Sequence, residues 1–135
     1  LIYHTHTSES YIENNNGIIP KDFFPRTQNS DKNIVAVGKK LSETLKKYKI
    51  SVIHDTTVHD FPNYKGSYNR SAITVKKYIN KYSQIPIIID LHRDSMGEES
   101  KNKNKNKNKI TRIKPVFTAK NLRTKIFWIN SRIIN

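Results

Sequence analysis

Histidine and acidic side chains follow two short apolar stretches of this sequence, in a pattern that suits metal-assisted hydrolysis. His4, His6 and Glu9 come just after the opening apolar residues, and His92 follows the apolar run 87–89. Zinc hydrolases typically use three imidazole or carboxylate ligands and leave a fourth position for water, whose pKa falls to about 7. Because the chain contains no Cys, any metal must be held by imidazole and carboxylate. His6, Glu9 and His92 can supply such a set.

Two alternatives stay open at the histidines. Side chains alternate along an extended segment, so His4 and His6 share a face only if the strand continues to His6; a turn after Thr5 would separate them. One of the two can bind metal while the other hydrogen-bonds substrate or a ligand. Lone histidines at strand ends are more often surface or hydrogen-bonded residues, and we assign His54 and His59 to that class.

The charged neighbours of these histidines are equally open to two interpretations. Glu9 is either a metal ligand or a capping carboxylate. Asp90 is either the carboxylate that orients the His92 ring or a plain acid at the end of a strand. Arg93 and Asp94 either take part in function or pair with each other.

Alternating strands and helices must position these residues within the first 99 residues. An apolar stripe at helical spacing predicts the first helix, in which Gly38 allows close approach to a sheet. The run Ile85–Leu91 is almost wholly apolar, as in a strand buried on both faces. We predict strands over Leu1–Tyr3, Ile50–His54 and Ile85–Leu91, and helices from Ser30 or Asp31 to about Tyr48 and from about Asn69 to Tyr82.

This order of elements indicates an α/β fold. A β, α, β, α, β sequence implies right-handed crossovers and hence a three-layer, mostly parallel sheet with flanking helices. Parallel sheets place their chemistry at the carboxyl ends of the strands, so both histidine clusters belong at one edge. Two polar loops, Tyr11–Ser30 and His54–Ser67, complete the pattern.

Positive charge is concentrated in the last third of the chain. The net charge of the 135 residues is +14, but residues 1–99 hold 14 basic and 11 acidic residues, whereas 100–135 hold 11 basic and no acidic ones. We therefore divide the chain into a partial catalytic domain (1–99), a Lys-Asn low-complexity segment expected to be disordered (100–109) and a basic tail without clear periodicity (110–135). No run approaches the roughly 18 apolar residues of a membrane span, no signal peptide precedes Leu1, and we interpret the chain as a fragment.

Four motifs, in order, resemble the successive signatures of the stage II sporulation protein P family. They are IYHTHTSESY (2–11), NIVAVG (33–38), HDTTVHDFPNYKGSYNRS (54–71) and IDLHRD (89–94), so the resemblance runs from residue 1 to about 95. It implies a zinc-dependent peptidoglycan hydrolase with an amidase-like fold, related to the N-acetylmuramoyl-L-alanine amidases, that also acts as an endopeptidase during engulfment in sporulation. It further implies an upstream membrane anchor, an extracytoplasmic location at the septum beside the forespore, and stage II sporulation protein D as a partner.

The resemblance also assigns roles to individual residues. His6 and His92 fall where the amidases have their first and second zinc histidines. The third amidase ligand is a Glu near the first long helix, which this chain lacks, so Glu9 is the expected replacement and His4 the second choice. For substrate binding, the loop His59–Ser71 and the strand that follows offer Asn63, Tyr64, Tyr68, Arg70 and Arg93.

The chain departs from the family pattern after Ser95, where we identify neither a further strand nor the general-base Glu of the amidases. Glu98 and Glu99 are weak replacements. We hypothesise that the catalytic domain is incomplete at its carboxyl side, through truncation or a slip of reading frame near the repeat. The alternative functions are a catalytically inactive basic remnant that binds cell wall and, less favoured, a nucleic-acid arm using Phe127 and Trp128. Metal-dependent barrels that open on a His-x-His motif need about 250 residues, which argues against them.

Overall fold

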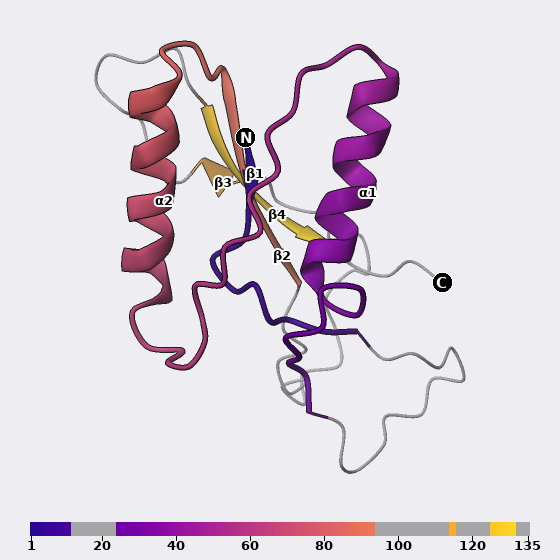
Figure 1. Cartoon of the computed structure of the whole chain (residues 1–135), viewed down its shortest axis with the longest axis vertical. Coiled ribbons are helices and arrows are strands. Elements are labelled where there is room, and N and C mark those ends of the chain that lie inside the picture. The colour runs from indigo at the N-terminus through magenta and orange to yellow at the C-terminus, as the bar shows by residue number, and fades with distance from the viewer. Residues whose placement is uncertain (12–23, 94–113, 116–124, 132–135) are drawn as a thin grey trace, which may run out of the picture.

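The α/β class predicted from the order of elements is confirmed. The structure, a computed structural model, describes residues 1–11, 24–93, 114–115 and 125–131, the last two stretches by their backbone (Figure 1). The predicted Lys-Asn segment, Glu98 and Glu99 lie outside the described residues. The elements are β1 (Ile2–Tyr3), α1 (Ile34–Lys47), α2 (Ser67–Lys81), β2 (Ile87–Arg93), β3 (Lys114–Pro115) and β4 (Lys125–Ser131).

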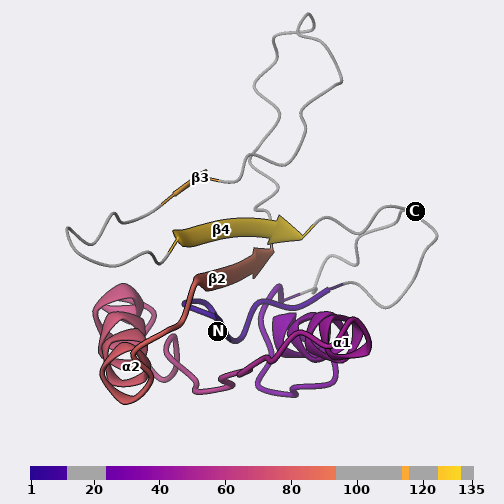
Figure 2. The same cartoon turned by 90° about the horizontal axis from the view of Figure 1, so that it is seen from above.

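The strands form one sheet in the order β1-β2-β4-β3 (Figure 2). β2 pairs in parallel with β1 on one side, at Ile2 and Ile89, and with β4 on the other, where Ile89 lies opposite Phe127. β3 pairs with β4 in the antiparallel sense. Our expectation that no strand follows Ser95 is therefore wrong, because two strands of this sheet come from the basic tail.

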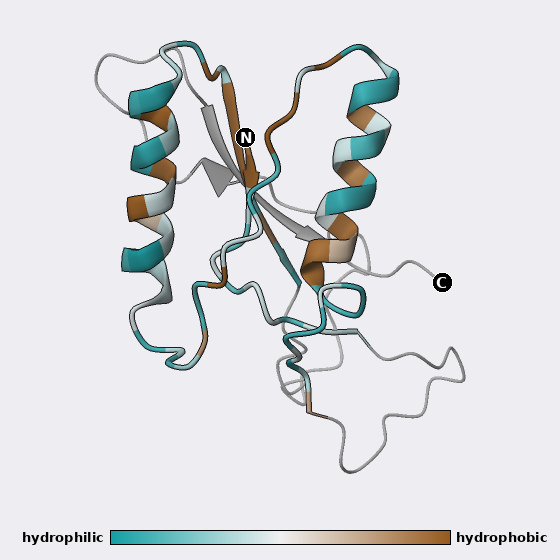
Figure 3. Cartoon of the chain, viewed as in Figure 1, coloured by the Kyte–Doolittle hydropathy of each residue, from teal (hydrophilic) through white to brown (hydrophobic). Residues whose placement is uncertain are grey.

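The two helices cover opposite faces of β1 and β2 (Figure 1). Successive side chains of a strand point to opposite faces. Accordingly, Tyr3 packs with Val75 of α2, whereas Ile2 packs with Ile34 of α1. The apolar bands of both helices alternate with hydrophilic ones (Figure 3), as expected for helices that bury one face against a sheet.

The helix ends differ by a few residues from those predicted. The cap of α1 is Asn33, not Ser30 or Asp31, and its side chain accepts a hydrogen bond from the amide of Val35 at 2.9 Å. Tyr48 lies beyond the helix and is 75% exposed, so it does not belong to the buried stripe. α2 begins at Ser67, directly after Gly66, whose φ of 86° only glycine adopts readily.

The predicted strand Ile50–His54 is reduced to a single parallel bridge between His54 and Ile2. β1 is only two residues long, and its hydrogen bonds to this segment are those of the Ile2 amide with Ile53 and of the Ile2 carbonyl with Asp55. β2, in contrast, starts later than predicted and continues through Arg93, which makes His92 part of a strand paired on both sides. Within the described ranges, neither helix has the length and apolar character needed to cross a bilayer.

Candidate functional site

A turn directly after β1 sends the two histidines of the opening motif in different directions. Residues 5–8 form this turn, and the amide of Glu9 donates to the carbonyl of His6 at 3.2 Å. The ring of His4 lies with Nδ1 3.0 Å from the carbonyl oxygen of Leu91 and Nε2 2.8 Å from Nε2 of His54. Of the two alternatives left open by the sequence, the structure thus has the one in which His4 and His6 are separated.

His6 and His92 lie next to each other. Their ring centroids are 5.1 Å apart, the rings are nearly perpendicular, and both residues are buried. His6 is carried by the turn after β1, and His92 by the carboxyl end of the adjacent strand β2. The neighbouring carboxyl ends of two parallel strands therefore bring these imidazoles together.

Carboxylates flank both nitrogens of His92. Oδ2 of Asp90 lies 2.9 Å from Nε2, and Oε2 of Glu9 lies 3.9 Å from Nδ1. Asp90 is itself fixed by the backbone amide and the hydroxyl of Thr5, at 2.9 and 2.7 Å. In the tautomer that metal binding through Nδ1 would require, the proton would lie on Nε2, on the side of Asp90, and the Nδ1 lone pair on the side of Glu9.

Burial sets the protonation of this group. It lowers the pKa of His6 to about 4, and the positive charges of His92 and Arg26 act in the same direction. Burial raises the pKa of Glu9, although the Arg93 amide, 2.8 Å from Oε2, opposes this shift. For Asp90 burial alone would raise the pKa, but the hydrogen bonds with His92 and Thr5 outweigh it, so the pKa is lowered. At neutral pH His6 is therefore neutral, as a metal ligand must be.

In residue type, His6, Glu9 and His92 fit a zinc ion. Ligand atoms around a tetrahedral zinc lie about 3.3 Å apart, so Glu9 needs only a small movement towards His92. Nε2 of His6 lies 3.2 Å from the hydroxyl of Tyr64 and Nδ1 lies 3.4 Å from that of Ser67, so either nitrogen would exchange a hydroxyl contact for the metal. In the part of the chain described, no three His, Asp or Glu side chains already form a ready-made metal-binding group. The ligand set remains a prediction, and the position of His4 makes it the weakest member.

Two tyrosines form an aromatic wall on the side of His6 that faces α2. Tyr64 stacks on the His6 ring with centroids 4.7 Å apart, and Tyr68 meets it edge-on at 5.2 Å. Each tyrosine is 53% exposed, so part of each ring remains available to a ligand. These are two of the residues predicted to bind substrate.

A sequence model described as Stage II sporulation protein P matches residues 1–131. The chain belongs to the stage II sporulation protein P family. It is also 32% identical over 101 residues to Stage II sporulation protein P of Bacillus subtilis (strain 168), a match that covers 70% of this chain and 24% of that protein. No solved structure matches the chain significantly.

Membership of the stage II sporulation protein P family supports a role in sporulation. The match also extends beyond residue 95, where the motifs that resemble the family end. A slip of reading frame near the Lys-Asn repeat predicts that the likeness stops there, so the matched range gives this hypothesis no support. The family likeness includes the segment that forms β3 and β4.

The other predicted substrate-binding residues have structural contacts: Asn63 and Arg70 within the loop before α2, and Arg93 with Glu9. Arg70 donates from Nε to the carbonyl of His59 at 2.6 Å, and its other nitrogens reach the carbonyls of Lys65 and Asn63. This guanidinium braces the loop that carries Tyr64. Arg93 contributes its backbone amide to Glu9, as described above.

His59 is a structural residue in this member of the stage II sporulation protein P family. It is buried, and its two nitrogens lie 2.8 Å from the His4 carbonyl and 2.8 Å from the Thr74 hydroxyl. The sequence-based assignment of His59 to the hydrogen-bonded class agrees with this geometry. His54 is only half-buried, and burial lowers its pKa.

Sequence analysis missed two residues beside the aromatic wall, Arg26 and Asp60. The buried carboxylate of Asp60 accepts hydrogen bonds from the amide and hydroxyl of Ser8, the latter at 2.6 Å, and from Nη1 of Arg26 at 2.8 Å. The guanidinium of Arg26 also lies 4.3 Å above the centre of the Tyr64 ring. Both residues lie in irregular loops, where no periodic pattern marks them.

Proposed function

We propose that this chain contains the site of a zinc-dependent peptidoglycan hydrolase that cleaves the N-acetylmuramoyl-L-alanine bond, with endopeptidase action as well, during engulfment. The proposal rests on one observation above all: His6 and His92 are buried side by side, with Glu9 on one nitrogen of His92 and Asp90 on the other. Membership of the stage II sporulation protein P family supports it. The proposal includes a three-layer, amidase-like fold, an extracytoplasmic location at the septum and stage II sporulation protein D as a partner.

In this proposal His6, Glu9 and His92 hold the zinc ion. Bound there, a zinc ion would supply polarisation of the scissile carbonyl and a water whose pKa is lowered to about 7. Asp90 keeps Nε2 of His92 protonated and so presents Nδ1 as the ligand atom. Tyr64 and Tyr68 cover one side of His6, and the exposed part of each side chain can contact a sugar or a peptide. A carboxylate must also accept a proton, and the two candidates from the sequence, Glu98 and Glu99, lie outside the described residues.

The alternative function is a protein that binds cell wall without cutting it. The exposed tyrosines beside His6 favour this alternative as much as they favour hydrolysis, because stacking on a glycan needs no metal. Among the described residues, His6, Glu9 and His92 do not surround one point, which also favours wall binding without hydrolysis.

Digestion of purified peptidoglycan by the zinc-loaded chain distinguishes these functions. Amidase action releases stem peptides with a new amino-terminal alanine and creates no new reducing sugar. We expect such peptides with the native chain and none with His92→Ala. Wall binding is measured by co-sedimentation of the same samples. Binding without release of peptides would contradict the proposed hydrolase function and support the alternative of a protein that binds cell wall without cutting it.

A further inference from the structure

Two arginines lie near the aromatic wall, and they are used in different ways. All three guanidinium nitrogens of Arg70 donate to backbone carbonyls of the loop that precedes α2. Arg26 makes its hydrogen bonds through Nη1, to Asp60 at 2.8 Å and to Ser8 at 3.4 Å. Among the described residues, the Nε–Nη2 edge of Arg26, which can form a two-pronged fork with a carboxylate, makes no hydrogen bond within the fold.

The backbone and side-chain contacts of Arg26 hold this edge close to the candidate site. Arg26 forms a β-bridge with Glu9, one of the predicted ligands. Its guanidinium lies over the ring of Tyr64, which also stacks on the ring of His6. The Arg26 side chain is 29% exposed, so a ligand beside His6 can reach it.

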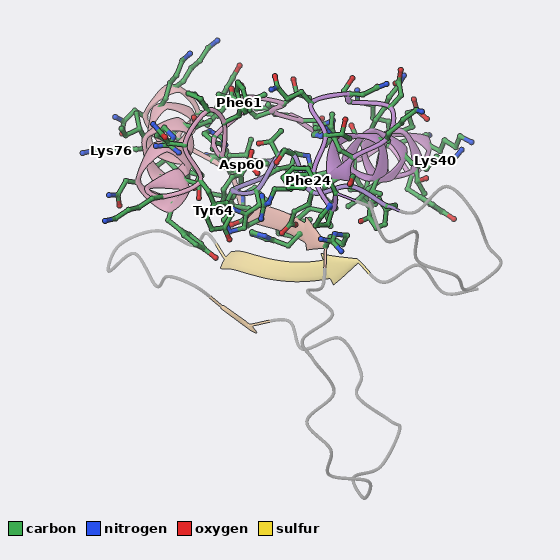
Figure 4. All side chains as sticks on the ribbon, turned by 90° about the horizontal axis from the view of Figure 1, so that it is seen from below. Phe24, Lys40, Asp60, Phe61, Tyr64 and Lys76 are labelled. Carbon is green, nitrogen blue, oxygen red and sulfur yellow. The ribbon has the colours of Figure 1, made fainter. Side chains whose placement is uncertain are left out.

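Asp60 fixes the orientation of Arg26 through a single nitrogen, Nη1. The Asp60 side chain is fully buried, and its two oxygens also accept the amide of Ser8, at 3.1 and 3.2 Å, as well as the Ser8 hydroxyl. Its negative charge is thus shared among several donors. A guanidinium clamped at one nitrogen and stacked on an aromatic ring loses little further freedom when it binds an anion. Figure 4 shows Asp60 and Tyr64 in the region between the two helices, whereas Lys40 and Lys76 point outward from them.

We propose that Arg26 binds a carboxylate of the molecule that occupies the His6–His92 site. This inference rests on the proposed function and makes its substrate class more specific: a stem peptide with a free carboxylate one residue beyond the scissile bond. In peptidoglycan this is the α-carboxylate of the γ-linked D-glutamate that follows alanine, roughly 6–8 Å along the chain from the bond that is cut. Arg26 and His6 both contact the Tyr64 ring, at 4.3 and 4.7 Å from its centre, so their separation is comparable with that spacing. Arg26 is therefore a specificity-determining residue.

The test is the binding of two stem peptides that differ at one group. L-alanyl-γ-D-glutamyl-L-lysine carries the free carboxylate, and its D-isoglutamine counterpart carries a carboxamide. Isothermal titration calorimetry with the whole chain should show about tenfold tighter binding of the free acid, the ratio expected for a charge-assisted hydrogen bond. Arg26→Gln should remove this preference, and Arg26→Lys, which keeps a charge for Asp60 but not the fork, should retain part of it.

Lys65→Gln is the matched control, because it removes an exposed positive charge from the loop that carries Tyr64 and should leave the preference intact. Thermal unfolding of each variant shows whether it is folded. If Arg26→Gln does not fold, the preference is measured with Arg26→Lys instead. Equal binding of the two peptides by the native chain, binding of neither, or an undiminished preference in both Arg26 variants overturns the inference. Wall digestion is measured separately, so hydrolysis without a carboxylate preference refutes this role of Arg26 and leaves the hydrolase standing.

Discussion

The five histidines of this chain fall into two groups that differ in what their nitrogens face. His4, His54 and His59 face one another, a backbone carbonyl or a hydroxyl, and they tie the turn after β1 to its surroundings. His6 and His92 instead lie ring against ring, with two carboxylates at the nitrogens of His92 and the hydroxyls of Tyr64 and Ser67 at those of His6. Both groups contain buried rings at the same edge of the sheet. Burial therefore does not separate a structural histidine from a candidate ligand, whereas two adjacent rings with carboxylates at one of them do.

The largest expected effect is loss of hydrolysis when the second group is broken. His92→Ala should reduce release of amino-terminal alanine from peptidoglycan more than about a hundredfold, because loss of a ligand exceeds the 10–100-fold effect of losing an orienting partner. Because His92 is buried, release is compared only between samples that circular dichroism shows to be folded. Unchanged release by His92→Ala would remove the distinction between the two groups.

His59→Ala should act on stability instead. It removes two hydrogen bonds and leaves a buried cavity, so we expect a loss of about 2–4 kcal/mol in the free energy of unfolding, measured by urea denaturation. Zinc binding by the fraction that remains folded should persist. A variant as stable as the native chain but unable to bind zinc would place His59 in the wrong group.

Gly38→Ala tests how tightly the first group is packed against α1. A Cβ at this position would lie 2.5 Å from Nε2 of His54 and 2.7 Å from Nε2 of His4, so the rings must move. We expect a destabilisation of about 1–3 kcal/mol, even though alanine normally favours a helix over glycine by about 1 kcal/mol. Circular dichroism melts measure it, and a stabilised variant would show that the His4–His54 pair yields easily.

Acid should weaken the fold through His4. Burial lowers its folded-state pKa to about 4, while an unfolded histidine titrates near 6.5. Between these values the unfolded chain binds more protons, so this contribution is complete above about pH 6.5 and lost as the pH falls towards 4. Lowering the pH from 7 to 5 should reduce the free energy of unfolding by about 1–2 kcal/mol through this residue. His4→Asn should show a flatter dependence in urea titrations at both pH values; an identical slope would contradict the assignment.

The sequence predicted the parts of the fold that periodicity determines. The stripe that begins at Ile34 located α1, and Gly38 does lie where α1 approaches the histidines beside the sheet. The meeting of His6 and His92 followed from the rule that parallel strands end at one edge. β4 was missed because residues 110–135 show no clear alternation, and its place depends on pairing with β2. The loop contacts of Arg26 with Asp60 and Tyr64 have no periodic signal in the sequence at all.

The most direct measurement is the zinc content of the purified chain, determined by elemental analysis after dialysis against a low concentration of zinc. The chain with all five histidines should hold one ion, and His54→Ala should hold the same amount. Replacement of either His6 or His92 by alanine should remove it. A metal-free native chain, or a full complement of zinc in the double variant of His6 and His92, would contradict a metal site built on these two rings.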